Sequence, residues 1–424
     1  MVKMLFALYA AFMLLVSVMI LYLLRHYIFS LVALYYKKGR PDYSRHAQSF
    51  KPTVSILIAA RDEEAVLGRL LHRVVKSTYP KDKLEVIVVD DASNDRTGTI
   101  ADEFARMYSF VKVVHRDPSV GGRGKPSALN AGLVYATGSV LLCFDADYYP
   151  PVDIVERLVA YFVDPEVGLV QGRVTVLNEP VSLVSRLATL ERIGGYRVDQ
   201  VARDKLGLVP QYGGTVGGVR KVLIDALGGW DTSILAEDTN LTLEAYLSGF
   251  KARYASDAEC YEETVTTWKA LWRQRYRWAK GHMQCFFKHF IPVVRSGNMS
   301  FREKIDGLLL LGVYFLPILA ALSWILGAVT FFFWPASWFE SVWYLLPVFA
   351  FSGVGNFGLF FEIGVGLYLD SRERLSWLMP VLFLSFMFNV FVCLKAFVDL
   401  VSSWIVGRKE QDWKKTLHQG DGLR

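Results

Sequence analysis

Carboxylate side chains stand where two apolar runs of the sequence end. Residues 84–90 (LEVIVVD) lead into Asp91, and residues 139–147 (SVLLCFDAD) finish with Asp145 and Asp147. The alternation of a strand places Asp145 and Asp147 on one side of the chain, where they suit a hard divalent cation that also takes diphosphate oxygens. Aspartates after strands also serve as turn and cap residues, so this spacing alone leaves both interpretations open.

A glycine-rich segment could bring backbone N–H groups close to phosphate. Residues 121–126 read GGRGKP, and Lys125 within them adds a point charge. The segment lacks the G-x-x-x-x-G-K-[ST] pattern and is therefore not a P-loop. It predicts either a phosphate-binding turn or a flexible surface loop.

Two predicted helices farther along the chain carry groups that could act on an acceptor. Asp238 precedes the amphipathic stretch 239–250, and it is either the N-cap of that helix or a general base in reach of an incoming hydroxyl. Residues 266–278 (TTWKALWRQRYRW) combine arginines with tryptophans, which is typical of a helix lying on a membrane surface. Such a helix can also line a site.

Alternating strands and helices must position these groups. Helical periods separate β-branched runs at 54–60, 84–90, 111–115, 139–147 and 167–176. Continuous Val/Ile/Leu strands separated by helices indicate an α/β fold with a mainly parallel sheet that is covered on both faces. Ligands of such sheets bind beyond the carboxyl ends of the strands, where the carboxylates stand.

Apolar stretches at both ends of the 424-residue chain predict a membrane protein with a polar middle. Hydrophobic residues make up 53%, charged residues 21% and the net charge is +6, which excludes disordered, collagen-like and disulfide-scaffold proteins. Residues 4–24 carry no charge and are long enough to cross a bilayer. The basic residues that follow them place the polar middle in the cytoplasm by the positive-inside rule.

The C-terminal part predicts three to four further spans, at 307–333, 341–369 and 376–406. Three spans would leave the basic tail outside, so residues 341–369, which three glycines interrupt, are expected to form a hairpin or a re-entrant pair. Within these stretches we expect Glu362 and Lys395 to reach an interface by snorkelling. A functional role is the alternative for both.

The four cysteines show no paired metal-ligand spacing, and a cytoplasmic domain is a reducing place. The sequence therefore predicts free thiols and no zinc site.

Five segments, taken in order, resemble a known family. They are VIVVDDASND with Asp91, GKPSALNAGL at 124–133, Asp145-x-Asp147, A-E-D at 236–238 and Q-R-Y-R-W at 274–278. Together they are similar to membrane-embedded family 2 glycosyltransferases, which include cellulose, hyaluronan, chitin and poly-N-acetylglucosamine synthases. The resemblance covers about residues 50–290 and implies a GT-A fold with a UDP-sugar donor and no nucleic-acid partner.

On the donor side, the resemblance implies a nucleotide-sugar site made of strand-end and loop residues: Ala59, Arg61, Glu63, Asp91, Lys125 and Asp145. Asp145 and Asp147 would hold Mg²⁺ or Mn²⁺ against the diphosphate. Ala92 stands where the family commonly has glycine, and Pro126 where a small residue is usual. Neither departure removes a charged group, so they concern the shape of the loops.

On the acceptor side, the resemblance makes Asp238 the base that deprotonates the acceptor hydroxyl. Gln274, Arg277 and Trp278 match a Q-x-x-R-W motif whose tryptophan stacks on the acceptor sugar and whose arginine neutralises the leaving diphosphate. The implied activity is inverting transfer that extends a β-linked polysaccharide and passes it across the membrane. The alternatives are a non-processive transferase acting on diacylglycerol or polyprenyl phosphate and, more remotely, a transporter or receptor that has reused the fold.

The resemblance and the apolar pattern together divide the chain into five segments. They are a membrane helix at 1–36, a GT-A catalytic domain at 50–260, interfacial helices with Q-x-x-R-W at 261–305, a membrane region at 306–406 and a basic cytoplasmic tail at 407–424. The expected place is the plasma membrane, with lipids and a growing glycan or lipid acceptor as partners. Whether a small accessory membrane subunit completes the channel stays open.

Overall fold

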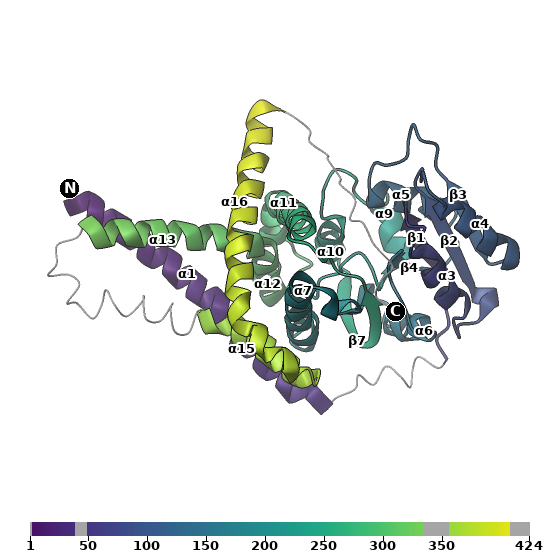
Figure 1. Ribbon diagram of the computed structural model, residues 1–424, viewed down its shortest axis with the longest axis horizontal. Helices are drawn as coiled ribbons and strands as arrows, with labels where there is room; N and C mark the ends of the chain where they lie inside the picture. Colours follow the sequence, from purple (N-terminus) through teal and green to yellow (C-terminus); the bar gives the residue numbers. More distant parts are fainter. Residues whose placement is uncertain (1, 39–48, 334–355, 408–424) are drawn as a thin grey trace.

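A single sheet forms the centre of the polar part in the computed structural model, which describes residues 2–38, 49–333 and 356–407 (Figure 1). In the described part of the chain it has seven strands in the order β3-β2-β1-β4-β6-β5-β7. The strands are β1 (Val54–Ala60), β2 (Leu84–Asp90), β3 (Val111–His115), β4 (Val140–Asp145), β5 (Val167–Val176), β6 (Gly217–Arg220) and β7 (Lys251–Glu262). Only β6 runs antiparallel to its neighbours, so the predicted α/β fold with a mainly parallel sheet is confirmed.

Four of the predicted strands have the expected bounds, and the predicted strand at 139–147 is shorter than expected. Two further strands, β6 and β7, were not predicted because their apolar pattern is weak. Strand β4 ends at Asp145, and Asp147 follows in a turn. The alternation of side chains along a strand therefore does not determine the direction of Asp147. Strand β6 (GGVR) is too short and too rich in glycine to give a β-branched run, and β7 mixes small and charged residues. Both were missing from the sequence-based prediction for that reason.

Helices pack on both faces of the sheet because alternate strand residues point to opposite sides. Ile56 and Ile58 of β1 belong to one buried cluster, which helices α3, α4 and α6 cover. Leu57, between them, belongs to a second cluster, which α5, α9, α10, α11 (Trp268–Arg295) and α12 (Phe301–Gly312) cover. The bounds are α3 (Leu67–Val75), α4 (Thr97–Met107), α5 (Lys125–Leu133), α6 (Ile154–Val159), α9 (Lys221–Ala226) and α10 (Glu237–Leu247).

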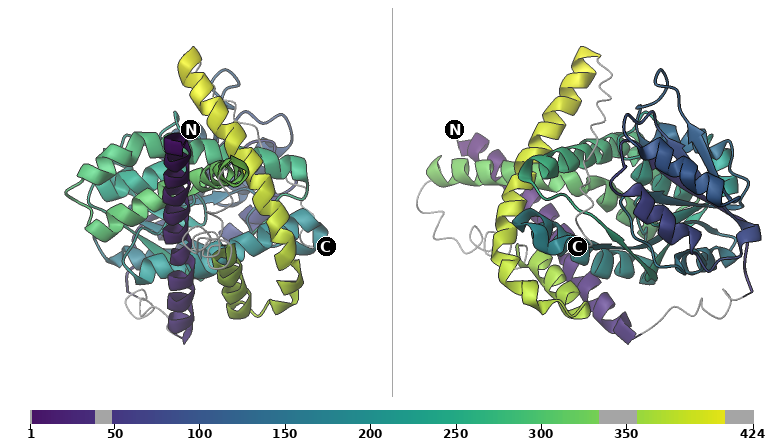
Figure 2. Two further views of the ribbon diagram at one scale, coloured as in Figure 1. Left: turned by 90° about the vertical axis from the view of Figure 1, so that its left-hand side faces the viewer. Right: turned by 45° about the vertical axis from the view of Figure 1, so that its right-hand side comes forward.

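Long apolar helices gather at the end of the molecule opposite the sheet (Figures 1 and 2). They are α1 (Val2–Tyr35), α13 (Leu316–Phe333), α15 (Asn356–Leu369) and α16 (Leu382–Val406). Three described stretches are long and apolar enough to cross a membrane, namely Phe6–Tyr35, Phe301–Val329 and Glu373–Val406. Most of the predicted hairpin at 341–369 and almost all of the predicted basic tail lie outside the described residues.

Glu362 is buried between helices and its carboxylate is not exposed, contrary to the predicted snorkelling. Its residue is only 3% exposed, and its carboxylate shares a hydrogen bond with Nδ1 of His26 in α1. A polar pair between two apolar helices is stable because each group satisfies the other away from water. Lys395 differs, since it is well exposed and pairs with Asp399 one turn away.

Two further helical segments connect the sheet with the apolar helices. One is continuous from α7 (Leu183–Ile193) through a π-helical turn, η5 (Gly194–Asp199), into α8 (Gln200–Lys205). The other is α11 (Trp268–Arg295), which carries the Q-x-x-R-W residues and begins at a Thr267 cap. Ion pairs secure these segments: Arg203 binds Asp306 of α12, and Arg25 of α1 lies 3.4 Å from Asp199.

Helix α11 approaches the start of α10 at a glycine. A Cβ atom placed on Gly281 would lie 2.6 Å from the backbone nitrogen of Ala236 and 2.7 Å from its Cβ. Contacts this short force backbone to move, since the neighbouring atoms are not the ends of flexible side chains. Gly281 therefore sets how closely α11 packs against the residue that precedes Glu237 and Asp238.

We predict that Gly281→Ala destabilises the protein although alanine favours helices. Overpacking costs about 1–3 kcal/mol, which exceeds the helix-propensity gain of up to ~1 kcal/mol. Thermal unfolding of the purified protein in detergent measures the effect. Gly312→Ala is the matched control, because a Cβ at that helix end meets nothing within 4 Å. An unchanged melting temperature for Gly281→Ala would show that the backbone at Ala236 moves away from the added methyl group without loss of stability.

Candidate active site

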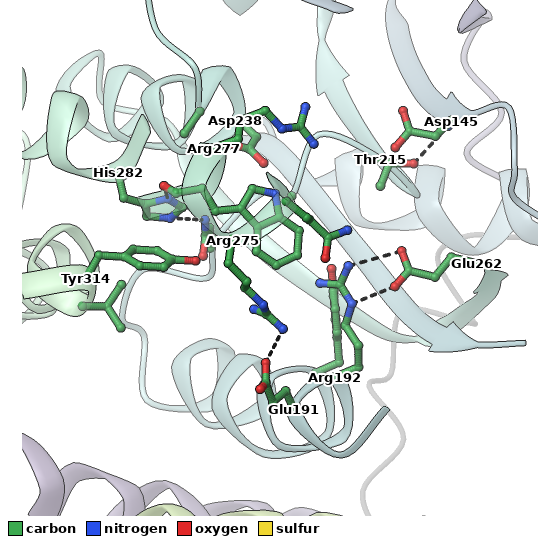
Figure 3. Close-up of a pocket in the computed structure, with 18 of the residues that line it drawn as sticks. Asp145, Glu191, Arg192, Thr215, Asp238, Glu262, Arg275, Arg277, His282 and Tyr314 are labelled. Atoms are coloured by element: carbon green, nitrogen blue, oxygen red, sulfur yellow. Dashed lines mark hydrogen bonds and ion pairs between the residues drawn. The ribbon is translucent and has the colours of Figure 1, made fainter. Parts of the chain in front are cut away.

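A cavity of about 630 Å³ begins at the carboxyl ends of the strands and continues between the apolar helices (Figure 3). Cavities of this size accommodate small-molecule ligands. Every residue predicted to belong to the donor or acceptor site lines it: Ala59, Arg61, Glu63, Asp91, Lys125, Asp145, Asp147, Asp238, Gln274, Arg277 and Trp278. The structure thus brings together residues that are up to 219 positions apart in the sequence.

Strand register explains why the donor-side residues meet. In the parallel ladder, Ala59 of β1 pairs with Asp145 of β4, and Ala60 pairs with Asp90 of β2. The three strands therefore end at one level, and the residues at and just after these ends share a single edge. This confirms that the strand-end carboxylates lie together at the carboxyl edge of the sheet.

Lys125 is held among acceptors at this edge. Its ammonium group pairs with the Asp145 carboxylate and donates a hydrogen bond of 2.9 Å to the carbonyl of Gly214. Burial works to lower the pKa of Lys125, but the charges of Asp145 and Glu237 outweigh it and raise that pKa above its usual value. A cation is thus kept at the first turn of α5, where the backbone N–H groups also favour an anion.

Asp91 is fixed by a cation that the sequence analysis missed. Its buried carboxylate pairs with Arg116, whose guanidinium also donates to the carbonyl of Val120 at 2.7 Å and to the hydroxyl of Ser127 at 2.9 Å. Arg116 stands alone after β3 and had no pattern to mark it. It connects the β2 edge to the glycine-rich segment.

The structure explains how the chain accommodates Ala92 at a position where the family commonly has glycine. Ala92 has φ +58°, a left-handed conformation that glycine adopts without strain. A Cβ on Gly121 would lie 2.6 Å from the Cβ of Ala92, so the two residues share one small space. The next residue, Gly122, lies against the guanidinium of Arg61, which would meet any added Cβ. The glycine-rich segment is therefore packed onto the donor edge.

Asp145 and Asp147 fit a divalent cation by their donor chemistry. Both carboxylates line the cavity, and the backbone N–H of Asp145 is held at 3.1 Å by the hydroxyl of Thr215. Among the described residues no group of three or more His, Cys, Asp or Glu side chains is arranged to hold a metal. Two carboxylates suit a cation that takes its remaining oxygens from a phosphate ligand and water.

Asp238 lies inside the first turn of α10, so the predicted N-cap alternative is wrong. Ala236 occupies the cap position, and Oδ1 of Asp238 accepts the backbone N–H of Thr239 at 2.6 Å. Burial and the neighbouring Asp238 carboxylate raise the pKa of Glu237 to about 7, against the charges of Lys125 and Arg277. Two adjacent carboxyl groups therefore face the cavity, and that of Glu237 binds a proton near neutral pH.

Trp278 is flanked by two arginines that the sequence analysis did not mark. The guanidinium of Arg275 lies 4.7 Å and that of Arg192 lies 5.2 Å from the indole ring, distances typical of cation–π contacts. Arg275 pairs with Glu191, and Arg192 donates to Glu262 at 2.7 Å (Figure 3). These contacts hold the indole in one orientation at the cavity wall.

Relatives of this chain include enzymes of both expected product classes. The probable glycosyltransferase YdaM of Bacillus subtilis is 40% identical over 56% of this chain and 57% of its own length. The beta-monoglucosyldiacylglycerol synthase of a Synechocystis strain is 35% identical over 63% of this chain and 56% of its own length. The poly-beta-1,6-N-acetyl-D-glucosamine synthase of Staphylococcus epidermidis is 25% identical over 82% of each chain. The chain thus spans little more than half the length of the first two.

A solved structure has the same fold. The mannosyltransferase PcManGT from Pyrobaculum calidifontis, in complex with GDP-Man and Mn²⁺, has a TM-score of 0.60 and 22% identity, over 87% of this chain and 99% of its own. Residues 52–281, more than half of this chain, match the sequence profile described as "Glycosyltransferase like family 2". Together with the mainly parallel sheet and the apolar helices, this match shows that the chain belongs to glycosyltransferase family 2.

Proposed function

We propose that this protein is an inverting glycosyltransferase that takes a sugar from a UDP-sugar and extends a β-linked polysaccharide at the membrane. One observation carries the proposal. The donor-side groups around Asp145 and the acceptor-side groups Asp238 and Trp278 line a single cavity, and that cavity continues between the apolar helices. A site with these two ends can hold a nucleotide sugar and an acceptor together.

The proposed chemistry follows from the groups at the two ends. The acceptor hydroxyl attacks the anomeric carbon while the bond to the nucleoside diphosphate breaks on the opposite side, which inverts the configuration. Asp238 takes the hydroxyl proton. Lys125 and Arg277 stabilise the negative charge that grows on the leaving diphosphate, and Trp278 offers a flat surface for the acceptor ring. A divalent cation held by Asp145 and Asp147 would add further stabilisation of that charge.

A glycan acceptor is supported by the lining of the cavity near the apolar helices. Amide and hydroxyl groups face it there: Gln200, Gln211, Tyr314, Ser385 and Asn389. Such groups make hydrogen bonds with sugar hydroxyls. The likeness to the poly-N-acetylglucosamine synthase also extends over 356 residues, which takes it beyond the catalytic segment into the apolar helices. We propose that the polysaccharide leaves by this route, with the catalytic part in the cytoplasm.

Transfer to a lipid is the second candidate, because the same end of the cavity also has an apolar side. Leu359, Ile363, Leu382 and Phe386 line it, and an acyl chain would bury itself against such groups. The 35% identity to a monoglucosyldiacylglycerol synthase favours this candidate as well. Donor and base would be the same in both reactions.

The nature of the product separates the candidates. Membranes that contain the protein are supplied with Mg²⁺ or Mn²⁺ and, in turn, with radiolabelled UDP-glucose, UDP-N-acetylglucosamine and UDP-galactose, and products are divided by organic extraction. We expect label from one donor in a large aqueous polymer. Label that stays in the organic phase would replace the polymer proposal with the lipid one, and UDP-binding membranes without any transfer would contradict both.

Asp238→Asn is expected to abolish transfer while UDP binding persists. The change removes the base and almost no volume, and a general base contributes about 10²–10⁴-fold to the rate. Rates from the labelled donor, with UDP affinity measured in parallel, provide the check. Turnover near the wild-type rate would end the assignment of Asp238 as base.

Glu237→Gln changes the residue next to Asp238 and tests how KM for the UDP-sugar depends on pH. Because the pKa of Glu237 is raised to about 7, its carboxyl is largely neutral at pH 6 and charged at pH 8. The added negative charge faces the anionic donor, so KM for the UDP-sugar should rise above pH 7 in the wild type. Glutamine stays neutral and should remove that rise. A KM that rises equally in both proteins would assign the pH effect to another group.

Trp278→Ala is expected to raise KM for the acceptor about fivefold, which corresponds to the ~1 kcal/mol of an aromatic contact. Trp272→Ala is the control, since Trp272 lies on the same helix but packs against Phe388. Initial rates at varied concentrations of a short oligosaccharide acceptor give both values. Equal KM values for Trp278→Ala and wild type would remove Trp278 from the acceptor site.

A further inference from the structure

His282 connects the helix of Trp278 with the helix of Asp238. It lies on α11 at the acceptor end of the cavity, near Tyr314, and is 8% exposed (Figure 3). Its Nδ1 is 3.0 Å from the carbonyl oxygen of Trp278. Its Nε2 is 3.0 Å from the hydroxyl of Thr239, the residue that follows Asp238. The Q-x-x-R-W motif ends before His282, so the sequence pattern gave this side chain no role.

These contacts determine which nitrogen carries the proton. A carbonyl oxygen only accepts hydrogen bonds, so Nδ1 of His282 must donate to Trp278 and therefore bears the hydrogen. In the neutral ring Nε2 is then an acceptor. The amide of Gln211 donates to the Thr239 oxygen at 2.8 Å and lies 3.2 Å from Nε2. The Thr239 hydroxyl, whose oxygen accepts from Gln211, can donate its own hydrogen to Nε2, the nearer of its acceptors at 3.0 Å.

The same hydroxyl has a second acceptor within reach. Oδ1 of Asp238 lies 3.4 Å from the Thr239 oxygen, against 3.0 Å for Nε2 of His282. A hydroxyl has one hydrogen, so it serves one of the two. A hydrogen bond donated to the carboxylate would stabilise its charged form and make it a weaker base. The direction of this hydroxyl therefore affects the proton affinity of Asp238.

We propose that His282 is a positioning residue for the transfer reaction, which holds the Thr239 hydroxyl away from Asp238 and so keeps the carboxylate able to take the acceptor proton. The inference rests on the proposed function, in which Asp238 is the base. His282 itself touches neither donor nor acceptor in this role. It acts only through the orientation of Thr239.

The charge state of the ring agrees with this role. Burial lowers the pKa of His282 below the usual histidine value, although the Asp238 carboxylate opposes the shift. The titratable groups that face the ring are Asp238 from α10 and Tyr314 from η6 (Val313–Phe315). Near neutral pH the ring is therefore uncharged. Protonation at lower pH would turn Nε2 into a donor, and the Thr239 hydroxyl would then turn to Asp238.

A second histidine provides a matched control. His289 lies on α11 two turns after His282, is also buried, and also contacts α10, through a 2.8 Å contact from its Nε2 to Asn240. It does not line the cavity. Its removal costs a comparable contact between the two helices without touching Thr239.

The test compares variants of the full chain in membranes, with kcat and KM determined for the UDP-sugar that the wild type uses. His282→Ala should lower kcat about tenfold, the usual effect of one hydrogen bond, with KM within twofold. His282→Gln should recover most of the rate, because its amide oxygen can accept from Thr239. His289→Ala should retain wild-type kcat. Wild-type kcat in His282→Ala would overturn the proposal.

A second substitution distinguishes positioning from mere packing. Thr239→Val removes the hydroxyl that His282 directs, so adding it to His282→Ala should return most of the lost rate. Loss of packing would instead make the double variant slower than either single variant. A double variant as slow as His282→Ala, or slower, would contradict the proposal.

The pH dependence gives a readout that survives if Thr239→Val fails to fold. Wild type should lose activity as His282 becomes protonated below its ordinary pKa of about 6.5, whereas His282→Gln cannot be protonated. The ratio of His282→Gln to wild-type activity should therefore rise as the pH falls, and other ionisations cancel in the ratio. A flat ratio would overturn the proposal.

The tautomer can be read without any turnover. Nitrogen chemical shifts of ¹⁵N-histidine-labelled protein, assigned through His282→Gln, should show Nδ1 protonated at pH 7.5. A hydrogen on Nε2 would contradict the inference even if no sugar is transferred. Absence of wild-type transfer, with the expected tautomer, would instead count against the proposed function.

Discussion

The geometry of the site depends on the close approach of α11 to the start of α10. Gly281 lies against the backbone of Ala236, and the helix to which Ala236 leads carries Asp238 in its first turn. Trp278 lies three residues before Gly281, and His282 lies four residues after Trp278, so these two side chains share one side of α11. A larger residue than glycine would move the part of α11 that carries Trp278 away from the start of α10. The relative position of Trp278 and Asp238 therefore depends on close packing at Gly281.

Buried charges fix the cavity relative to the apolar helices. Arg203 bridges α8 to Asp306, and Glu191 accepts from Arg275 of α11 and, at 2.8 Å, from Ser385 of α16. Such pairs add little to stability because each charge loses its hydration. They do make other arrangements of these helices unfavourable, since a shifted helix would leave a buried charge unpaired. The continuity of the cavity from the sheet edge into the apolar helices follows from this selectivity.

Much of the donor side could be predicted because it depends on local patterns. Runs of Val, Ile and Leu marked four strands at their observed bounds, and Asp145 was found because a parallel sheet places strand ends together. The acceptor side was predicted only in part, since the resemblance pointed to Trp278 but nothing marked Arg192. That arginine lies in the last turn of α7, and a pair with Glu262, 70 residues farther along the chain, holds it in place. Glu362 was misjudged for the same reason, because its partner His26 is 336 residues away.

The contact between Ala92 and Gly121 has a consequence for how such sequences diverge. Because the two positions share space for about one methyl group, a side chain at one requires glycine at the other. Glycine at position 92 would remove the shortest contact and leave backbone atoms of Asp117 and Asp91, at 3.3 and 3.4 Å, next to a Cβ at position 121. The structure therefore predicts that residue types at these two positions covary among related sequences. Their covariation would record the shape of this turn in sequences for which no structure is known.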